Sequence, residues 1–151
     1  MAEKITETTL SDCTVCVNFN LRKAMRAVSQ HYDKILAPAK LRCTQFTILT
    51  ILSRMGTMTV TDLAENLVMD RTTLTRNLKP LEKEGYLTIL PNVSDRRTRN
   101  IAITRVGKKA QETAMPYWRQ AQNEMIAFMG EEDARRLISS SQKISTLHQP
   151  S

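Results

Sequence analysis

The feature that most constrains this chain is a leucine stripe between Asp70 and Gly85. Leu74, Leu78 and Leu81 are separated by four and three residues, so an α-helix places all three side chains on one face. Asp70 is a favourable N-cap, and Gly85 is a favourable residue after a helix end. The stripe therefore predicts a helix with one buried face.

A shorter helix is predicted immediately before this one. Thr61 is expected to cap it, and Leu63, Ala64 and Leu67 are expected to form its buried side. Val68-Met69 then forms a tight turn into the next helix. Two helices joined in this way form a helix-turn-helix.

The rest of the chain predicts further helices and one hairpin. Strands at 87–90 and 100–103 flank a polar segment, 91–99, with a basic tip. Apolar residues at helical spacing predict helices at 14–36, 44–55 and from 105 onward, the last broken at Gly130. Four glycines and 5% aromatic residues argue against a β-sandwich or barrel. The fold class is therefore mainly α with a small β-hairpin.

Positive charge is concentrated in one part of the chain. Residues 70–109 carry ten Lys or Arg and four Asp or Glu, a net charge of +6 out of +7 for the whole chain. A concentrated basic segment is typical of proteins that bind the nucleic-acid backbone. A solvated charged surface is the alternative interpretation.

Three groups of residues together resemble the MarR family of bacterial winged-helix regulators over nearly the whole chain. They are Asp70-Arg71-Thr72-Thr73-Leu74-Thr75-Arg76, then Asp95-Arg96-Arg97, and finally Thr104 with Gly107. The resemblance implies a single domain over 1–151, with a winged helix-turn-helix at 44–104 and dimerisation helices at 14–36 and 105–148. It also implies a homodimeric repressor that binds a palindromic double-stranded DNA operator and is released by a small ligand or by cysteine oxidation. A cytoplasmic location is expected on separate grounds, because three cysteines, an odd number, give no disulfide framework.

The helix face opposite the leucine stripe is the expected DNA reader, because an α-helix fits the major groove and Arg and Thr bond to base edges. The major-groove candidates are Arg71, Thr72, Thr73, Thr75 and Arg76. Lys79, Arg96 and Arg99 are expected to contact backbone phosphates, which position the protein. By the resemblance, Arg97 enters the minor groove and Asp95 supports it; a solvent-exposed face is the alternative.

Two cysteines, Cys13 and Cys16, lie at the start of the first predicted helix. A helix N-terminus and a Cys-x-x-Cys spacing both lower a thiol pKa, and the thiolate is the reactive form. Some MarR relatives sense peroxide through a cysteine in this region. Asn20, however, stands where an aromatic partner of Cys16 is expected in that pattern. Small buried residues in a dimer interface are the alternative, and the zinc reading is disfavoured because two cysteines and His31 leave the ligand set incomplete.

Other functions have little support in the sequence. No glycine-rich phosphate loop, nucleophile elbow or metal-ligand cluster is present, so neither an enzyme nor a cofactor is expected. No apolar run approaches the roughly 20 residues of a membrane span. A winged helix that binds protein or RNA, without an operator, remains the alternative function, as does activation in place of repression. The resemblance puts a ligand site near Phe19, His31, Phe46 or Trp118, but core packing is the commoner role for residues at such positions, so none of them is assigned to a ligand.

Overall fold

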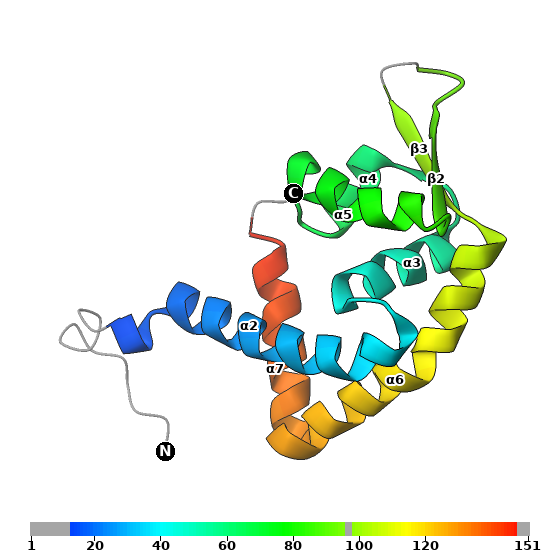
Figure 1. The fold of residues 1–151 in the computed structure, drawn as a ribbon. Helices are drawn as coiled ribbons and strands as arrows, with labels where there is room; N and C mark the ends of the chain where they lie inside the picture. The colour runs from blue at the N-terminus through cyan, green and yellow to red at the C-terminus, as the bar shows by residue number, and fades with distance from the viewer. Residues whose placement is uncertain (1–12, 96–97, 148–151) are drawn as a thin grey trace.

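The computed structural model of the chain describes residues 13–95 and 98–147 (Figure 1). The described part is mainly helical, with one small antiparallel sheet in the strand order β1-β3-β2, so the predicted fold class is confirmed. The elements are η1 (Cys13–Val15), α2 (Val17–Leu36), η2 (Ala37–Ala39), α3 (Cys43–Met55), β1 (Met58–Thr59), α4 (Val60–Asn66), α5 (Arg71–Lys83), β2 (Leu87–Pro91), β3 (Arg99–Ile103), α6 (Arg105–Met129) and α7 (Glu131–Ser145).

The long helix α6 links the two ends of the molecule. It begins at the base of the β2–β3 hairpin, packs against α2 and α3, and leads into α7, which turns back toward α4 and α5 (Figure 1). The hairpin pairs Leu87 with Ile103 and projects beyond the helices as a wing (Figure 1). The helix-turn-helix and the wing therefore lie at the same end of the chain's fold.

The core explains why the predicted leucine stripe forms. Leu74, Leu78 and Leu81 are all fully buried, as predicted. They join a cluster that also includes Leu49 of α3 and Leu63 of α4. Burying a leucine side chain stabilises a fold by roughly 1.5–3 kcal/mol, so this face of α5 is strongly held inward.

The predicted cap of the first helix of the helix-turn-helix is wrong by two residues. Thr59, not Thr61, caps α4, because its hydroxyl accepts the Asp62 N–H at 3.0 Å while the Asp62 carboxylate accepts the Thr59 N–H at 3.4 Å. Pairing of Met58 with Ile101 in β1 sets the chain direction just before this cap. Thr61 therefore lies inside the first turn of α4.

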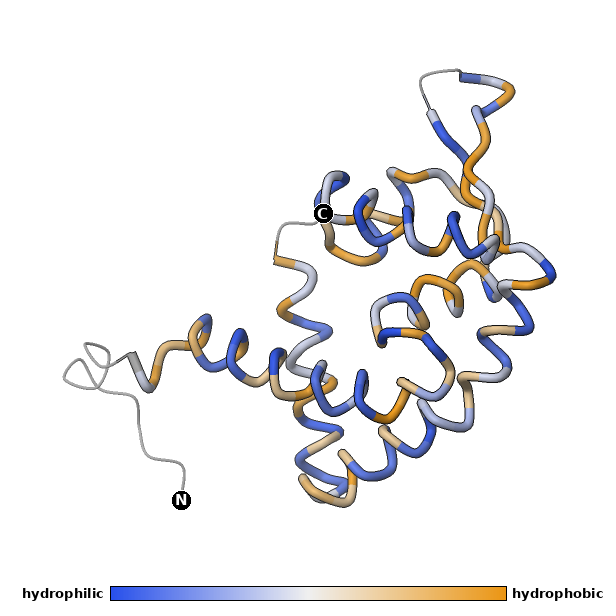
Figure 2. Tube along the Cα trace, viewed as in Figure 1, coloured by the Kyte–Doolittle hydropathy of each residue, from blue (hydrophilic) through white to orange (hydrophobic). Residues whose placement is uncertain are grey.

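The first predicted long helix begins later than residue 14, since η1 precedes α2 at Val17. Its apolar stripe is buried only near its C-terminal end, at Tyr32 and Leu36. The predicted apolar positions on α2 at Val17 and Leu21, and on α6 at Val106 and Phe128, are exposed in the single chain. Hydrophobic segments along α2 and α7 are visible in Figure 2. The exposed apolar side chains of α7 and the turn after it are Leu137, Ile138, Ile144 and Leu147.

The turn between α4 and α5 is built around Val68, whose φ is +49°. Its N–H donates to the Glu65 carbonyl, and the Met69 N–H donates to the Ala64 carbonyl at 2.8 Å. This hydrogen-bond pattern is a Schellman motif with valine at the position where glycine is usual. Left-handed backbone is costly for a β-branched residue, so hydrogen bonds and packing on both sides must hold the turn.

Thr104 and Gly107 fix the start of α6 against the end of α5. The Thr104 hydroxyl donates to the Gly85 carbonyl at 2.6 Å and accepts the Gly107 N–H at 3.0 Å, while the Thr104 N–H donates to the Tyr86 carbonyl. A Cβ added to Gly107 would lie 1.9 Å from that Tyr86 oxygen. The contact therefore requires glycine at 107.

We expect Gly107→Ala to lower the free energy of unfolding by about 2 kcal/mol, because the added methyl group collides with backbone that cannot rotate away. Urea unfolding followed by circular dichroism measures this. Lys108→Ala, at an exposed position in the same turn, is the matched control and should change stability little. Equal stabilities of the two variants would contradict the close approach.

Candidate functional site

The exposed face of α5 gathers five of the predicted residues. A shallow hollow of about 370 Å³ is lined by Arg71, Thr72, Thr75, Arg76 and Lys79. All five side chains are exposed, whereas the leucines on the opposite side are buried. The burial of one face thus determines which side chains the helix presents to a partner.

Thr73, the remaining predicted residue of α5, is engaged in helix capping. Its N–H donates to Asp70 Oδ1 at 2.8 Å and its hydroxyl donates to Asp70 Oδ2 at 2.6 Å. These hydrogen bonds hold the pKa of Asp70 below its ordinary value. Because the Thr73 proton is directed at Asp70, this side chain organises the start of α5.

The wing loop is organised by Asn92 and Asp95. The Asn92 side-chain oxygen accepts the Ser94 N–H at 2.8 Å, and its amide donates to the Asn100 side chain across the hairpin at 3.1 Å. The Asp95 carboxylate accepts the Thr98 hydroxyl at 3.0 Å. Asp95 therefore supports the loop through Thr98. Arg96 and Arg97 lie outside the described residues, and Arg99 is exposed at the start of β3.

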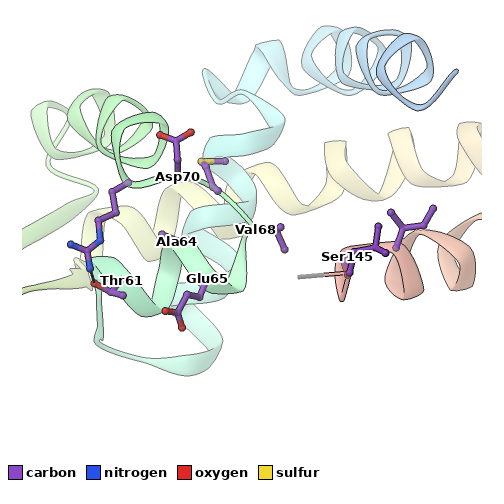
Figure 3. Close-up of a pocket in the computed structure, with 10 residues that line it drawn as sticks. Thr61, Ala64, Glu65, Val68, Asp70 and Ser145 are labelled. Carbon is purple, nitrogen blue, oxygen red and sulfur yellow. Dashed lines mark hydrogen bonds between the residues drawn. The ribbon is translucent and has the colours of Figure 1, made fainter. Parts of the chain in front are cut away.

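A cleft of about 500 Å³ separates α5 from the wing. Arg71 and Thr75 line it from α5, Thr61 from α4, and Asp95 and Arg99 from the wing. Arg71 Nη2 donates to the Thr61 hydroxyl at 2.8 Å (Figure 3). Sequence patterns did not point to Thr61 as a neighbour of this site, since the contact joins residues ten positions apart on two helices.

The basic side chains of α5 and Arg99 form no ion pair within the part of the chain that the structure describes. Among residues 13–95 and 98–147, basic and acidic side chains approach closely at His31 with Glu124 and at two Arg–Glu pairs along α7. None of them involves a basic side chain of α5 or Arg99. The positive charges at this end of the molecule therefore remain available to an anionic partner.

A second groove, of about 870 Å³, lies between the helix-turn-helix and the end of α7 (Figure 3). Ala64, Val68 and Met69 line one side, and Ile144 and Leu147 line the other. Its lining is mostly apolar, with Glu65 and Asp70 among the polar members. This groove lies next to the turn that precedes α5.

The cysteines lie in different surroundings. The Cys16 side chain is exposed, and the Asn20 amide donates to the backbone carbonyls of Thr14 and Cys16 at 2.6 and 3.0 Å. Cys43 is half-buried; burial raises the pKa of its thiol, and nearby Asp33 raises it further. The side chain of Cys13 lies outside the described residues.

Three of the four aromatic residues considered for a ligand site contact another helix. Phe46 is buried and stacks on Trp118 with ring centroids 5.9 Å apart. His31 Nε2 lies 3.4 Å from a Glu124 oxygen, which links α2 to α6. Phe19 is exposed on α2. These four residues therefore do not line one common hollow among those described above.

Residues 13–95 and 98–147 bring together no three His, Cys, Asp or Glu side chains in an arrangement that holds a metal ion. No single helix among them is long and apolar enough to cross a membrane; only Val17–Ala39 taken together with Cys43–Met55, bent by 71°, meets those criteria.

Comparison with known proteins identifies similar chains. The model of the MarR family matches residues 41–98. The organic hydroperoxide resistance transcriptional regulator of Bacillus subtilis is 30% identical over 97 residues, which cover 64% of this chain and 66% of that protein. The regulator PecS of Dickeya dadantii is 31% identical over 90 residues, covering 58% and 54%. The chain thus spans between half and two thirds of the length of these curated relatives.

Similarity to a solved structure extends over more of the chain. The crystal structure of the M. tuberculosis transcriptional regulator MosR in complex with DNA has a TM-score of 0.76 and 32% sequence identity. The match covers 88% of this chain and 98% of that one. It therefore includes the helices outside the segment matched by the family model.

We expect Cys16 to react with iodoacetamide several-fold faster than Cys43, because Cys16 is exposed whereas burial raises the pKa of Cys43 and lowers its thiolate fraction. Mass spectrometry of tryptic peptides after timed labelling of the Cys13→Ser variant gives both rates. In urea the two rates should converge. A Cys43 rate equal to that of Cys16 in the folded protein would contradict the assignment.

Proposed function

The chain belongs to the MarR family of transcriptional regulators, and from this premise we propose that it is a homodimer that binds a palindromic site in double-stranded DNA. The observation that carries the proposal is the exposed face of α5. Buried leucines hold this helix in place, and its free face and the neighbouring wing carry cations without carboxylate partners among the described residues. The DNA complex of the similar MosR chain supports the same partner.

In this proposal α5 enters the major groove. Thr72, Thr75 and Arg76 lie on its free face, where arginine recognises guanine and threonine contacts a base edge or a thymine methyl group. Lys79 extends toward a phosphate at the same face. Such phosphate contacts position the protein without reading sequence.

The wing is proposed to contact the adjacent minor groove. Arg97 is the proposed reader, and Arg96 and Arg99 are proposed phosphate contacts. A narrow minor groove has an enhanced negative potential that attracts arginine. The contact between Asp95 and Thr98 supports this assignment, because it joins the residues on either side of Arg96 and Arg97.

Dimerisation is proposed to occur through α2, the end of α6, and α7. These helices leave apolar side chains exposed in the single chain, including Val17, Phe128 and Ile138. Covering them with a second copy would remove that surface from water. Two-fold symmetry would then present two α5 helices to the two halves of a palindrome.

Release from DNA is proposed to follow either ligand binding or cysteine oxidation. The groove between α7 and the α4–α5 turn supports the first route, since it joins the proposed dimerisation and DNA-binding parts. The exposed Cys16 and the similarity to a hydroperoxide resistance regulator support the second. Asn20 bonds to backbone carbonyls near Cys16, which differs from the aromatic partner of the peroxide-sensing pattern.

DNA binding is tested with duplexes selected from a random pool by the purified protein. We expect a gel shift to favour a palindromic duplex over random DNA. Arg76→Ala should weaken this binding at least tenfold, because each of the two subunits loses a bidentate base contact that contributes about 1–3 kcal/mol. Lys143→Ala, an exposed change on α7, should change it less than twofold. Absence of any duplex preference in the wild type would favour a protein-binding or RNA-binding winged helix.

The dimer is tested by light scattering after size exclusion. We expect a mass of about twice the 17.2 kDa of one chain. Ile138→Asp should shift the protein toward the single-chain mass, because it places a charge in the proposed apolar interface. Ser139→Asp, the next residue on α7, is the matched control. A wild type that stays at the single-chain mass at micromolar concentration would overturn the dimer.

A further inference from the structure

Arg71 is the candidate base reader whose side chain bonds to a neighbouring helix. Its guanidinium donates to the Thr61 hydroxyl of α4 at 2.8 Å, and the bond crosses from the first residue of α5 to the first turn of α4 (Figure 3). Thr61 is half-buried, so its side chain is confined, whereas Arg71 is exposed. The hydrogen bond therefore holds a long, flexible side chain on the α4 side of the helix start.

Arg71 also lines the cleft between α5 and the wing. Arg71 and Arg99 line this cleft from opposite elements, together with Asp95. The Asp95 carboxylate accepts the Thr98 hydroxyl. The cleft thus combines two cations and one carboxylate, and it has a net positive charge.

The geometry of a DNA duplex determines which of its chemical groups would face this cleft. If α5 occupies a major groove and the wing the adjacent minor groove, the sugar-phosphate backbone that separates the two grooves lies between them. A long side chain in the cleft that is bonded to α4 then lies within reach of the phosphate oxygens of that backbone. Guanidinium has five N–H donors, so one bond to Thr61 leaves donors for a bidentate contact with phosphate.

We propose, on the basis of the proposed DNA-binding function, that Arg71 is a backbone-phosphate contact and that Thr61 is the positioning residue that aims it. This assignment replaces the base-reading role expected from the sequence pattern. Specificity at the major groove then comes from Thr72, Thr75 and Arg76. Arg71 adds affinity and salt dependence that are the same for every duplex.

The test measures binding of the full-length protein by fluorescence anisotropy. The probes are the selected operator, a set of operators with single base-pair changes, and a random duplex, each over a salt series. Arg71→Ala should weaken binding to every duplex by a similar factor, roughly tenfold. The slope of log K against log [salt] should fall by about 0.9 per lost phosphate contact, hence by about 1.8 for two subunits.

Arg76→Ala is the contrasting variant. Loss of a base contact should flatten the preference for one base pair over the others at a single operator position. If Arg71→Ala flattens a preference in the same way, or leaves affinity and salt slope unchanged, the phosphate assignment is overturned. Arg71→Lys, which keeps the charge but not the bidentate geometry, should retain the wild-type preference with intermediate affinity. Thermal unfolding of each variant excludes misfolding as the cause.

Thr61→Val tests the positioning role, because it keeps the side-chain shape and removes the acceptor. It should weaken binding to all duplexes by a smaller factor than Arg71→Ala does. In the Arg71→Ala background it should have no further effect, since the two residues act through one contact. An undiminished Thr61→Val effect in that background would overturn the positioning role. Failure of the wild type to prefer any duplex would instead reject the proposed function itself.

Discussion

Burial of Leu74, Leu78 and Leu81 is the constraint on which the rest of the site depends. A helix that buries one face cannot rotate about its axis without exposing these side chains to water, at a cost of several kcal/mol. The rotation of α5 about its axis is therefore fixed. This determines which side chains lie on its free face. The contact of Thr104 and Gly107 with Gly85 and Tyr86 then joins the end of this region to α6.

The arrangement of charge follows from the same constraint. The basic residues of α5 lie opposite the leucines, and the wing projects beside them from the sheet (Figure 1). Asp70, just before α5, and Asp95, in the wing, accept hydrogen bonds from Thr73 and Thr98. These hydrogen bonds direct the two carboxylates toward the start of α5 and toward the wing loop. Within residues 13–95 and 98–147 no ion pair involves a cation of α5 or Arg99, and this is the physical basis of the proposed function.

Much of the fold could be predicted from the sequence, because its signals are local. The leucine spacing, the Asp70 and Thr104 caps and the position of the hairpin depend on residues within a few positions of one another, and all are confirmed. The Thr61 cap was wrong because Thr59 offers an equally suitable hydroxyl, and pairing of β1 with a strand some forty residues away decides between them.

The candidate site was only partly predictable for a similar reason. Helical periodicity places Thr72, Thr75 and Arg76 on one face, as found. The bond between Arg71 and Thr61 depends on how α4 packs against α5, and no pattern within either helix contains that information. The exposed residues of α2 and α7 have apolar periodicity without a core partner in their own chain. Burial of that kind would come from a second copy, whose position a single sequence does not specify.

Chemical probing of the bound operator tests the central claim most directly. Dimethyl sulfate methylates guanine N7 in the major groove and adenine N3 in the minor groove, so one reagent reports on both. The account predicts protection of both groove types at neighbouring positions in each half-site, arranged symmetrically about the operator centre. Protection confined to one groove, or an asymmetric single patch, would contradict the joint engagement of α5 and the wing.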